Sequence, residues 1–505
     1  MAQTIFELLK TGGDDAPAFS APERPSLDYA GLRRHVAATV ERLNALGIGR
    51  NDRVAIVLAN GPEMASAFLA IGAGATTAPL NPAYRAEEFE FYLSDLNAKA
   101  LVIEDGADSP ALAVAKKLNV PVIRLKADPK GPAGLFGLDG TAGGKPAKGG
   151  FAEPGDVALV LHTSGTTSRP KIVPLSQRNV TASAGNIAKT LALVPADRCL
   201  NIMPLFHIHG LMAATLASMA AGASVFCSPG FNALKVFAWL DEAKPTWYTA
   251  VPTVHQAIVA RAERNPDSVK RAKLRFIRSS SSSLPPQVMA ELERVFNAPV
   301  IESYGMTEAS HQMASNPLPP KARKPGSVGI AAGPEVAIMD DAGNLLPQGG
   351  VGEIVIKGEN VTAGYENNPK ANEGAFTNGW FRTGDQGSFD ADGYLSITGR
   401  LKEIINRGGE KISPREVDEV LLDHPAVAQA ITFAMPHAKL GEEVAAALVL
   451  KEGASATESD IRTFVAGRLA DFKVPRKVVF LAEIPKGATG KAQRIGLAEK
   501  LGLGA

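Results

Sequence analysis

The sequence predicts an α/β protein: a large N-terminal domain of layered α/β subdomains that includes a β-rich subdomain, followed by a small α+β C-terminal domain. Three observations lead to this prediction. A chain of 505 residues is too long for one hydrophobic core. Short apolar runs rich in β-branched residues alternate with helix-length segments through the first half, which is typical of parallel sheets covered by helices. From Val336 onward, closely spaced turns and short strands replace this alternation.

The N-terminal strands are expected in the short β-branched runs. These runs span residues 53–58, 100–104, 121–125, 157–162, 246–251, 274–278 and 299–302. Residues 128–150 are rich in Gly, Pro and Lys, which predicts a surface loop. Residues 211–226 are Ala-rich and shorter than the ~20 apolar residues that a membrane-spanning helix needs, so a buried helix is expected there. Ligands of parallel sheets are expected at the carboxyl ends of the strands.

The domain boundary is expected near residues 400–402, which gives an N-terminal domain of residues 1–400 and a C-terminal domain of residues 401–505. Before the boundary, a turn at residues 340–344 and a strand at residues 352–357 indicate the β-rich subdomain. After it, residues 403–412 have the pattern of a hairpin, and Ser413, Pro414 and Glu416 have the spacing of a capping box at a helix start. The remaining elements are strands at residues 427–434, 444–450 and 477–481 and a helix at residues 457–469.

Composition excludes several classes of partner. The 53 Lys and Arg residues nearly balance the 52 Asp and Glu residues, which removes the electrostatic argument for nucleic acid or an anionic membrane. The two cysteines, Cys199 and Cys227, lie in apolar settings without CxxC or His spacing, so neither a disulfide framework nor a zinc site is indicated. A reducing, cytoplasmic location is expected, with no targeting signal at either end.

A run of hydroxyl residues, glycine and cations directly follows the strand expected at residues 157–162. It contains Thr163, Ser164, Gly165, Thr166, Thr167 and Lys171. Glycine lets backbone N–H groups approach an anion, hydroxyls add donors or magnesium ligands, and lysine supplies positive charge, so a nucleotide triphosphate is expected here. Pro170 occupies the place of the second glycine of a Walker-type P-loop, which disfavours an ordinary P-loop NTPase. The alternative is a Ser/Thr-rich surface turn.

Four further segments concentrate polar residues where strands are expected to end. They are residues 304–308 (YGMTE), 380–385 (WFRTGD), 399–403 (GRLKE) and 485–491 (PKGATGK). Together with the first run, and in the same order, they resemble the core motifs of the adenylate-forming enzymes, which include acyl-CoA synthetases, aryl-CoA ligases, firefly-type luciferases and peptide-synthetase adenylation domains. The resemblance runs from about residue 20 to 495. It implies that a carboxylate attacks the α-phosphorus of ATP to give acyl-AMP and pyrophosphate, and that the thiol of CoA then attacks acyl-AMP.

The resemblance also implies roles for individual residues, with ATP, Mg²⁺ and CoA as cofactors and co-substrates. The run from Thr163 to Lys171 would hold the β- and γ-phosphates. Glu308 and Thr167 would bind Mg²⁺, and Thr307 would contact the α-phosphate. The adenosine contacts implied are Tyr304, Gly305, Ser282 and Ser283 for the base, and Asp385 with Arg400 for the ribose hydroxyls.

The C-terminal domain would be mobile and would rotate between the two half-reactions. Lys491 would bring a cation to the carboxylate oxygen and the α-phosphate during adenylation. Lys402 matches the hinge position, and Gly408 and Gly409 would line the channel for the CoA arm, where the absence of side chains suits a narrow passage. Relatives from bacteria also imply that a lysine acetyltransferase can act on Lys491 and neutralise its charge.

The residues expected around the acyl group are unusually polar. A run of five serines, residues 279–283, stands where many relatives carry a Gly-Ala-rich segment. His207 matches the aromatic-gate motif and, with Thr307, Glu308 and Lys491, completes the catalytic set implied. Because imidazole and hydroxyl groups donate hydrogen bonds, His207, Ser281 and His311 are expected to hold the oxygens of a small, charged acid. This constellation looks closest to the oxalyl-CoA synthetases, which makes oxalate the expected substrate.

Other interpretations of the same residues stay open. His207 is also interpretable as a gate residue alone, His209 as a core histidine, and the serines as adenine contacts. Malonate, another small acid, a medium-chain acid or an aryl acid would then be the substrate. An adenylation enzyme that acylates a carrier protein is a second class of function, although no carrier motif is visible in the sequence. A luciferase-like oxidase is disfavoured because the acyl pocket is too polar for a large aromatic substrate.

Overall fold

The computed structural model describes residues 2–141, 143–163, 170–485 and 492–504, which form two compact units. Unit 1 comprises Met1–Thr163, Ile172–Val336 and Ile356–Ala375. Unit 2 comprises Ser164–Lys171, Ala337–Val355 and Phe376–Ala505. The domain boundary expected at residues 400–401 stays a prediction. Within the described residues, no helix combines the length and the apolar character needed to cross a membrane.

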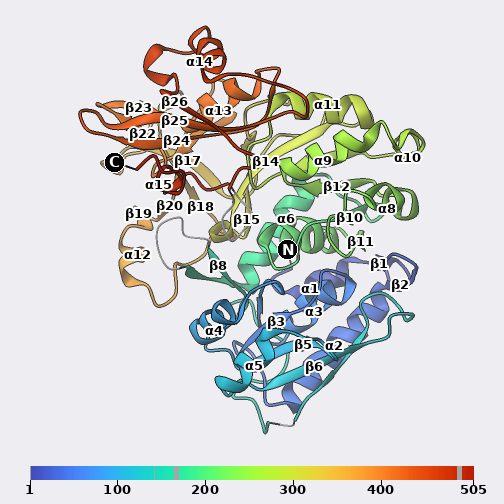
Figure 1. Ribbon diagram of the computed structural model, residues 1–505. Helices are drawn as coiled ribbons and strands as arrows, with labels where there is room; N and C mark the ends of the chain where they lie inside the picture. The colour runs from blue at the N-terminus through green and yellow to red at the C-terminus, as the bar shows by residue number, and fades with distance from the viewer. Residues whose placement is uncertain (1, 142, 164–169, 486–491, 505) are drawn as a thin grey trace. The chain divides into compact units, whose positions relative to one another are not determined.

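The first sheet of unit 1 has seven strands and is mostly parallel (Figure 1). In spatial order its strands are β7 (Phe136–Asp139), β6 (Val122–Ala127), β5 (Ala100–Glu104), β3 (Arg53–Val57), β4 (Thr76–Pro79), β8 (Val157–Thr163) and β9 (Lys171–Ser176). Alternate strand residues such as Leu101 and Ile103 form a core with α4 (Ala86–Asp95) and α5 (Pro110–Lys117). Two further helices, α2 (Tyr29–Ala45) and α3 (Pro62–Gly72), pack against each other.

The second sheet of unit 1 has nine strands, and it positions the candidate site. In spatial order they are β16 (Ile330–Ala331), β15 (His311–Ser315), β14 (Val300–Met306), β13 (Phe276–Ser279), β12 (Trp247–Ala250), β10 (Arg198–Asn201), β11 (Ser224–Cys227), β1 (Pro17–Ala21) and β2 (Arg24–Asp28). The strands from β14 to β1 run parallel, so their carboxyl ends meet at one edge. One core of this sheet includes residues of α8 (Val236–Ala243), α9 (Pro252–Ala262) and α11 (Pro286–Phe296).

Helices α6 (Gln177–Thr190) and α7 (Ala217–Ala220) pack together beside the π-helix η2 (His209–Leu216). The prediction of one buried helix over residues 211–226 is therefore only partly right. The helix ends at Ala220, Gly222 has a φ of +66° that turns the chain, and Ser224–Cys227 forms β11 instead. The loop expected at residues 128–150 likewise contains the short edge strand β7.

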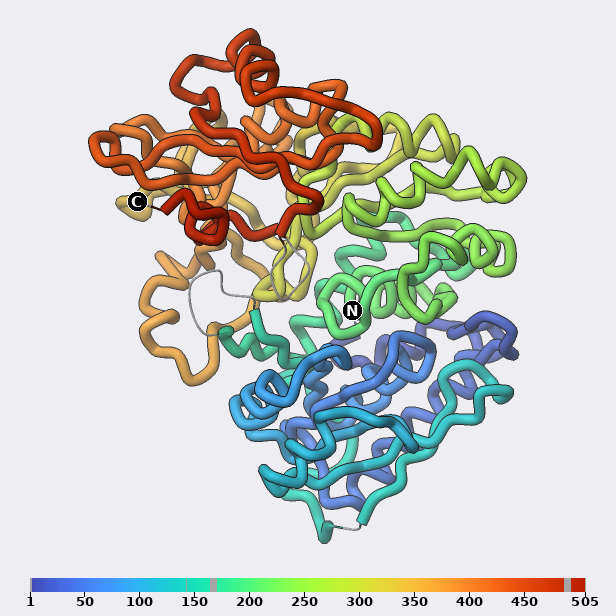
Figure 2. Tube along the Cα trace, in the orientation of Figure 1, coloured from blue at the N-terminus to red at the C-terminus, as the bar shows by residue number. Residues whose placement is uncertain are grey.

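Unit 2 contains two five-stranded sheets. The first consists of β17 (Glu335–Met339), β18 (Gly352–Lys357), β20 (Trp380–Phe389), β19 (Phe376–Thr377) and β21 (Leu395–Arg400). The second consists of β23 (Glu410–Ile412), β22 (Ile405–Arg407), β25 (Gly441–Leu450), β24 (Val427–His437) and β26 (Lys477–Phe480). Figure 2 traces β24 and β25 as long antiparallel neighbours.

Helices α13 (Pro414–Leu422) and α14 (Glu458–Ala466) share a core with the second sheet of unit 2. The Ser413 hydroxyl accepts a hydrogen bond from the backbone N–H of Glu416, as the expected helix start requires. The α/β fold class, the β-rich part and the α+β C-terminal part are thus confirmed. The remaining short helices are α1 (Ile5–Leu8), α10 (Pro266–Arg271), α12 (Pro369–Glu373) and α15 (Leu497–Lys500), with 3₁₀ turns at Leu9–Thr11, Thr307–Ala309 and Asp471–Lys473.

Candidate active site

The candidate site lies where β12, β13 and β14 end, beside the first residue of the π-helix. His209 begins that helix and is buried. Its Nδ1 lies 3.0 Å from Oγ of Ser281, and its Nε2 lies 2.6 Å from Oγ1 of Thr249. Gly210 allows this arrangement, because a Cβ there would lie 2.4 Å from the carbonyl oxygen of Pro204. π-Helical turns are rare and occur frequently at functional sites.

Arg278, which the sequence analysis did not select, lies at the centre of this cluster. Its side chain is completely buried on β13. Nη1 lies 3.3 Å from Thr249 Oγ1 and 3.3 Å from His311 Nε2, and Nη2 lies 3.3 Å from Gln312 Oε1. Burial lowers the pKa of Arg278 to about 9, so the guanidinium still carries its charge at neutral pH.

No carboxylate of the described residues forms an ion pair with Arg278, and its Nε–H has no hydrogen-bond partner there. An ionised group removed from water is costly unless another charge or several hydrogen bonds compensate it. Three contacts at 3.3 Å are long for charge-assisted hydrogen bonds. The cluster therefore holds an incompletely compensated positive charge at the edge where ligands of parallel sheets bind.

The backbone around the cluster is strained. Ser281, Ser310 and His311 have φ values of +73°, +47° and +97°, although none of them is a glycine. Such conformations cost of order 1–3 kcal/mol each and concentrate at functional sites. Gly305, the ladder partner of Gln312, lies against His311, and a Cβ at residue 305 would lie 1.8 Å from the His311 carbonyl oxygen and 3.2 Å from its Nδ1. The expected residues Ser281 and His311 are thus brought together on either side of His209, whose ring stacks on that of His311 at a centroid distance of 5.0 Å.

The other serines of the run differ in their surroundings. Ser280 is buried and donates to the Ser303 carbonyl oxygen at 3.0 Å. Ser279 is buried at the end of β13. Ser282 is exposed and Ser283 is half-buried. Of the five hydroxyls on which the expectation of a polar acyl pocket rested, only Ser281 joins the histidine cluster. His207 is half-buried two residues before the π-helix, with its ring beside that of Phe206.

The expected magnesium ligand Glu308 lies in the 3₁₀ turn after β14. Its side chain is buried, and Tyr365 donates a hydrogen bond to Glu308 Oε1 at 2.8 Å. The backbone of Thr362 also donates to the Glu308 carbonyl oxygen at 2.8 Å, which fixes the turn. Tyr304 is buried near the end of β14, and Thr307 is half-buried. An oriented carboxylate oxygen next to hydroxyl groups suits the oxygen preference of Mg²⁺.

In unit 2 the structure brings the two expected ribose contacts together. Asp385 on β20 and Arg400 on β21 are direct partners in an antiparallel ladder, and Arg400 Nε lies 3.2 Å from Asp385 Oδ1. Lys402 is exposed in the turn that follows β21. Gly408 and Gly409 form the hairpin turn between β22 and β23 with φ values of +61° and +102°, which glycine adopts without strain.

The expected residues Ser164, Gly165, Thr166, Thr167 and Lys491 lie outside the described residues. Thr163 ends β8, and Lys171 begins β9.

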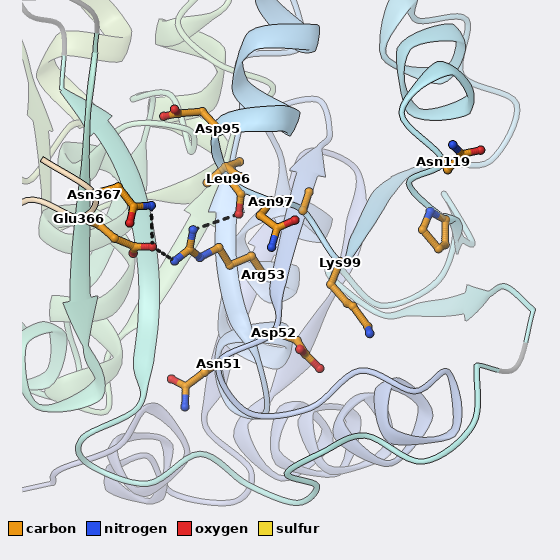
Figure 3. A pocket seen from close by; sticks show the side chains of 12 residues that line it. Asn51, Asp52, Arg53, Asp95, Leu96, Asn97, Lys99, Asn119, Glu366 and Asn367 are labelled. Atoms are coloured by element: carbon orange, nitrogen blue, oxygen red, sulfur yellow. Dashed lines mark hydrogen bonds and ion pairs between the residues drawn. The ribbon is translucent and has the colours of Figure 1, made fainter.

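A polar cavity of about 690 Å³ occurs elsewhere in unit 1, at the amino ends of β3, β5 and β6 (Figure 3). Arg53 crosses it, donating to the Leu96 carbonyl oxygen and forming an ion pair with Glu366. Arg53, the charged side chain that crosses this cavity, forms an ion pair, and the cavity lies at the amino ends of the strands. The cavity therefore lacks both features of the histidine cluster, a charge without an ion pair in the described chain and a position at the carboxyl ends of the strands.

Two family models match the chain. The model described as AMP-binding enzyme matches residues 9–366, and the model described as AMP-binding enzyme C-terminal domain matches residues 416–491. The chain is 46% identical over 486 residues to the oxalate–CoA ligase of Arabidopsis thaliana, which covers 95% of this chain and 94% of the relative. It is 45% identical over 475 residues to the oxalate–CoA ligase of Saccharomyces cerevisiae, covering 89% and 87%.

Among solved structures, ATP-bound MatB from Rhodopseudomonas palustris matches with a TM-score of 0.88 and 30% identity over 99% of both chains. The matched residues of the first family model contain the β12–β14 edge, the histidine cluster and Glu308, and those of the second contain β24, β25, β26 and α14 of the α+β C-terminal part. The resemblance drawn from the five sequence motifs is thereby confirmed. The chain belongs to the family of AMP-binding enzymes.

Proposed function

We propose that this protein is an AMP-forming acid–thiol ligase that activates oxalate with ATP and transfers the oxalyl group to CoA. The observation that carries the choice of substrate is the histidine cluster: a buried guanidinium without a carboxylate partner in the described chain, surrounded by hydroxyl and imidazole groups. Oxalate has no alkyl portion to bury, so it is recognised through its oxygens. The oxalate–CoA ligases among the relatives support the same choice.

In the first half-reaction, one carboxylate oxygen of oxalate attacks the α-phosphorus of ATP, and the bond between that phosphorus and the pyrophosphate oxygen breaks. The second carboxylate is held by Ser281 and His311, and His207 closes the pocket. Glu308, oriented by Tyr365, and Thr167 would hold Mg²⁺, which neutralises charge on the phosphates when bound. In the second half-reaction, the thiolate of CoA attacks the carbonyl carbon of oxalyl-AMP, and AMP leaves.

The roles of the remaining residues are proposed on the family resemblance. Thr163, Ser164, Gly165, Thr166 and Lys171 bind the β- and γ-phosphates; Tyr304, Gly305, Ser282 and Ser283 contact adenine; and Thr307 contacts the α-phosphate. Asp385 accepts hydrogen bonds from the ribose hydroxyls, with Arg400 beside it. Lys491 stabilises the charge that develops during adenylation.

We further propose that residues 401–505 rotate about Lys402 between the half-reactions and bring Gly408 and Gly409 to the CoA arm. A cytoplasmic location is proposed as well, and the two free, buried cysteines are compatible with it. Acetylation of Lys491 by a lysine acetyltransferase, which would neutralise its charge, is also proposed. An intact-mass measurement after treatment with such an enzyme tests it directly.

The test of substrate choice is ATP- and CoA-dependent release of AMP with a panel of acids. Oxalate should exceed hexanoate and coumarate in kcat/KM by at least about 100-fold, because a site built to hydrogen-bond oxygens rejects substrates that leave its polar groups unpaired, and it should exceed malonate by about 10-fold or more because of the extra methylene. The assay contains no carrier protein, so activity with free CoA also excludes a carrier-dependent adenylation enzyme. A preference for hexanoate or coumarate would contradict the proposal.

A further inference from the structure

Arg278 fixes the direction of the hydrogen bonds that it forms with Thr249, His311 and Gln312, because a guanidinium donates and never accepts. Its Nη1 lies 3.3 Å from Nε2 of His311, so that nitrogen is the acceptor. The His311 ring is therefore neutral and carries its proton on Nδ1. Nδ1 is the nitrogen on the side of Gly305, a residue of the proposed nucleotide site.

The second branch passes through Thr249. Its Oγ1 accepts from Arg278 Nη1 at 3.3 Å, so the buried threonine proton needs another acceptor. His209 Nε2, at 2.6 Å, accepts it. His209 then carries its own proton on Nδ1 and donates it to Ser281 Oγ at 3.0 Å. This leaves the Ser281 hydroxyl proton to be donated away from the histidine.

The branch through Thr249 and His209 thus ends in a hydrogen-bond donor, the Ser281 O–H, whereas the other branch makes His311 Nε2 an acceptor of Arg278. Arg278 and Thr249 lie directly opposite each other on adjacent strands that pair in parallel register. Gln312, whose amide nitrogen donates to Thr190 Oγ1 and the Ala332 carbonyl oxygen, presents its Oε1 to Arg278 and holds the guanidinium in place.

We propose that Arg278 is a positioning residue that determines specificity: it fixes the tautomer of His311 and, through Thr249 and His209, directs the Ser281 hydroxyl proton toward the second carboxylate of a short dicarboxylate. Arg278 does not touch the substrate in this arrangement. It supplies a positive potential and fixes two tautomers, and a doubly charged acid gains more from both than a singly charged acid of the same size. This inference rests on the proposed function for the identity of the acid, but not for the tautomers.

The kinetic test compares oxalate with oxamate, in which a neutral amide replaces one carboxylate at nearly the same size. The wild-type enzyme should prefer oxalate by about 100-fold in kcat/KM. In Arg278→Met this preference should fall below about 10-fold, mainly through a higher KM for oxalate, because the lost interaction is made in the ground state as well as the transition state. Arg278→Lys, which keeps the charge without the forked geometry, should recover part of the preference.

Arg275→Met is the matched control. Arg275 precedes the same strand by one residue and forms an ion pair with Asp197. Its removal should lower thermal stability and leave the ratio of oxalate to oxamate unchanged. If Arg278→Met lowered activity with both acids by the same factor, or left the ratio unchanged, Arg278 would be a structural residue and the inference would be wrong.

Two further measurements keep the test independent of folding and of substrate identity. Thr249→Val retains the shape of the side chain and cuts only the branch to His209, so it should lower the preference for oxalate without removing the buried charge. ¹⁵N-histidine NMR of the ligand-free enzyme should find His311 and His209 neutral with protons on Nδ1. Protons on Nε2 would overturn the inference, whereas a wild-type preference for another acid would overturn only the proposed function.

Discussion

Arg275, one residue before β13, and Arg278, near the carboxyl end of that strand, have opposite electrostatic surroundings. Arg275 lies at the amino end, where Nε lies 2.9 Å from Asp197 Oδ1 and Nη2 lies 2.8 Å from Oδ2. Asp197 also accepts from the hydroxyl of Thr246 at 2.7 Å, so its carboxylate is fully used. Arg278 lies toward the carboxyl end, completely buried, without an ion pair among the residues described.

This difference separates the parts of the sheet that stabilise the fold from those that bind a ligand. A buried charge without a partner costs several kcal/mol, and the amino end avoids this cost with a forked ion pair. At the carboxyl end, the charge of Arg278 stays available for an anionic ligand. This is the end at which open α/β sheets bind their ligands. Substitutions at the carboxyl end should therefore change activity more than stability, and those at the amino end the reverse.

The largest effect is expected for Glu308→Gln at the carboxyl end. The substitution keeps the size of the side chain and the contact to Tyr365 but removes the charge that would bind Mg²⁺. We expect kcat to fall by about 10³-fold, corresponding to roughly 4 kcal/mol of transition-state stabilisation. Higher Mg²⁺ concentrations should recover part of it, and steady-state AMP release measures both.

The thermal midpoint of Glu308→Gln should stay at the wild-type value or rise, because a buried charge is removed. A loss of less than tenfold in kcat would show that Glu308 has no role in metal binding. A large drop in the thermal midpoint would remove the distinction between the two ends of the sheet.

Asp197→Ala is the corresponding change at the amino end. It removes the ion pair to Arg275 and the acceptor of Thr246, at a side chain that is only 2% exposed. Because Arg275 itself is 39% exposed and can be solvated after the change, we expect a loss of about 3 kcal/mol in the free energy of unfolding, at the low end for a broken buried pair. Urea unfolding measures this loss. The kcat/KM of the folded variant should equal the wild-type value, and a tenfold decrease would contradict the comparison.

The sequence was sufficient to predict β3, β5, β6, β8, β12, β13 and β14, because strands buried on both faces are recognisable as short apolar, β-branched runs, whereas β4, β10 and β11 of the same two sheets were not predicted. Ser281, Glu308 and His311 follow such runs, where polar residues are expected at one edge of the sheet, and their roles in the site stay predictions. The sequence was insufficient for Arg278 and Thr249, which are 29 residues apart and meet only through the pairing register of β12 and β13. The sequence did contain one signal of Arg278, because an arginine inside an otherwise apolar strand indicates a buried charge that has a function.

The run of five serines has the same limit, because the sequence does not show which of the hydroxyls are used within the protein. Composition counts hydroxyls, but the strand direction decides which of them face the ligand, and Ser280 donates to the backbone of the neighbouring strand instead. Similarly, an Ala-rich stretch does not distinguish a helix from a buried strand, so the start of β11 at Ser224 depended on the turn at Gly222.

His255 is a buried histidine near the carboxyl end of the sheet that we expect to affect stability and not activity. It lies in α9 beside the Tyr248 hydroxyl, and burial lowers its pKa from 6.5 to about 4. The unfolded chain takes up a proton below about pH 6.5 and the folded chain does not, so stability is complete above that pH and falls toward pH 4. From pH 7 to pH 5 the loss should be about 2 kcal/mol. In urea unfolding, the free energy of unfolding of His255→Phe should fall by about 2 kcal/mol less between pH 7 and pH 5 than that of the wild type. An equal fall in both proteins would contradict this role of His255.

The smallest effect is expected for two tyrosine hydroxyls that can be compared directly. Tyr365 donates to Glu308 at 2.8 Å at the carboxyl end, whereas Tyr29 donates to the Ala223 carbonyl oxygen at 2.7 Å, one residue before the amino end of β11. Tyr365→Phe should lower kcat about 10-fold, because the carboxylate loses the donor that orients it, with little change in thermal midpoint. Tyr29→Phe should lower the free energy of unfolding by about 1 kcal/mol and leave kcat unchanged. If both variants lost stability and neither lost activity, Tyr365 would be a packing residue, and the carboxyl end would resemble the amino end in this respect.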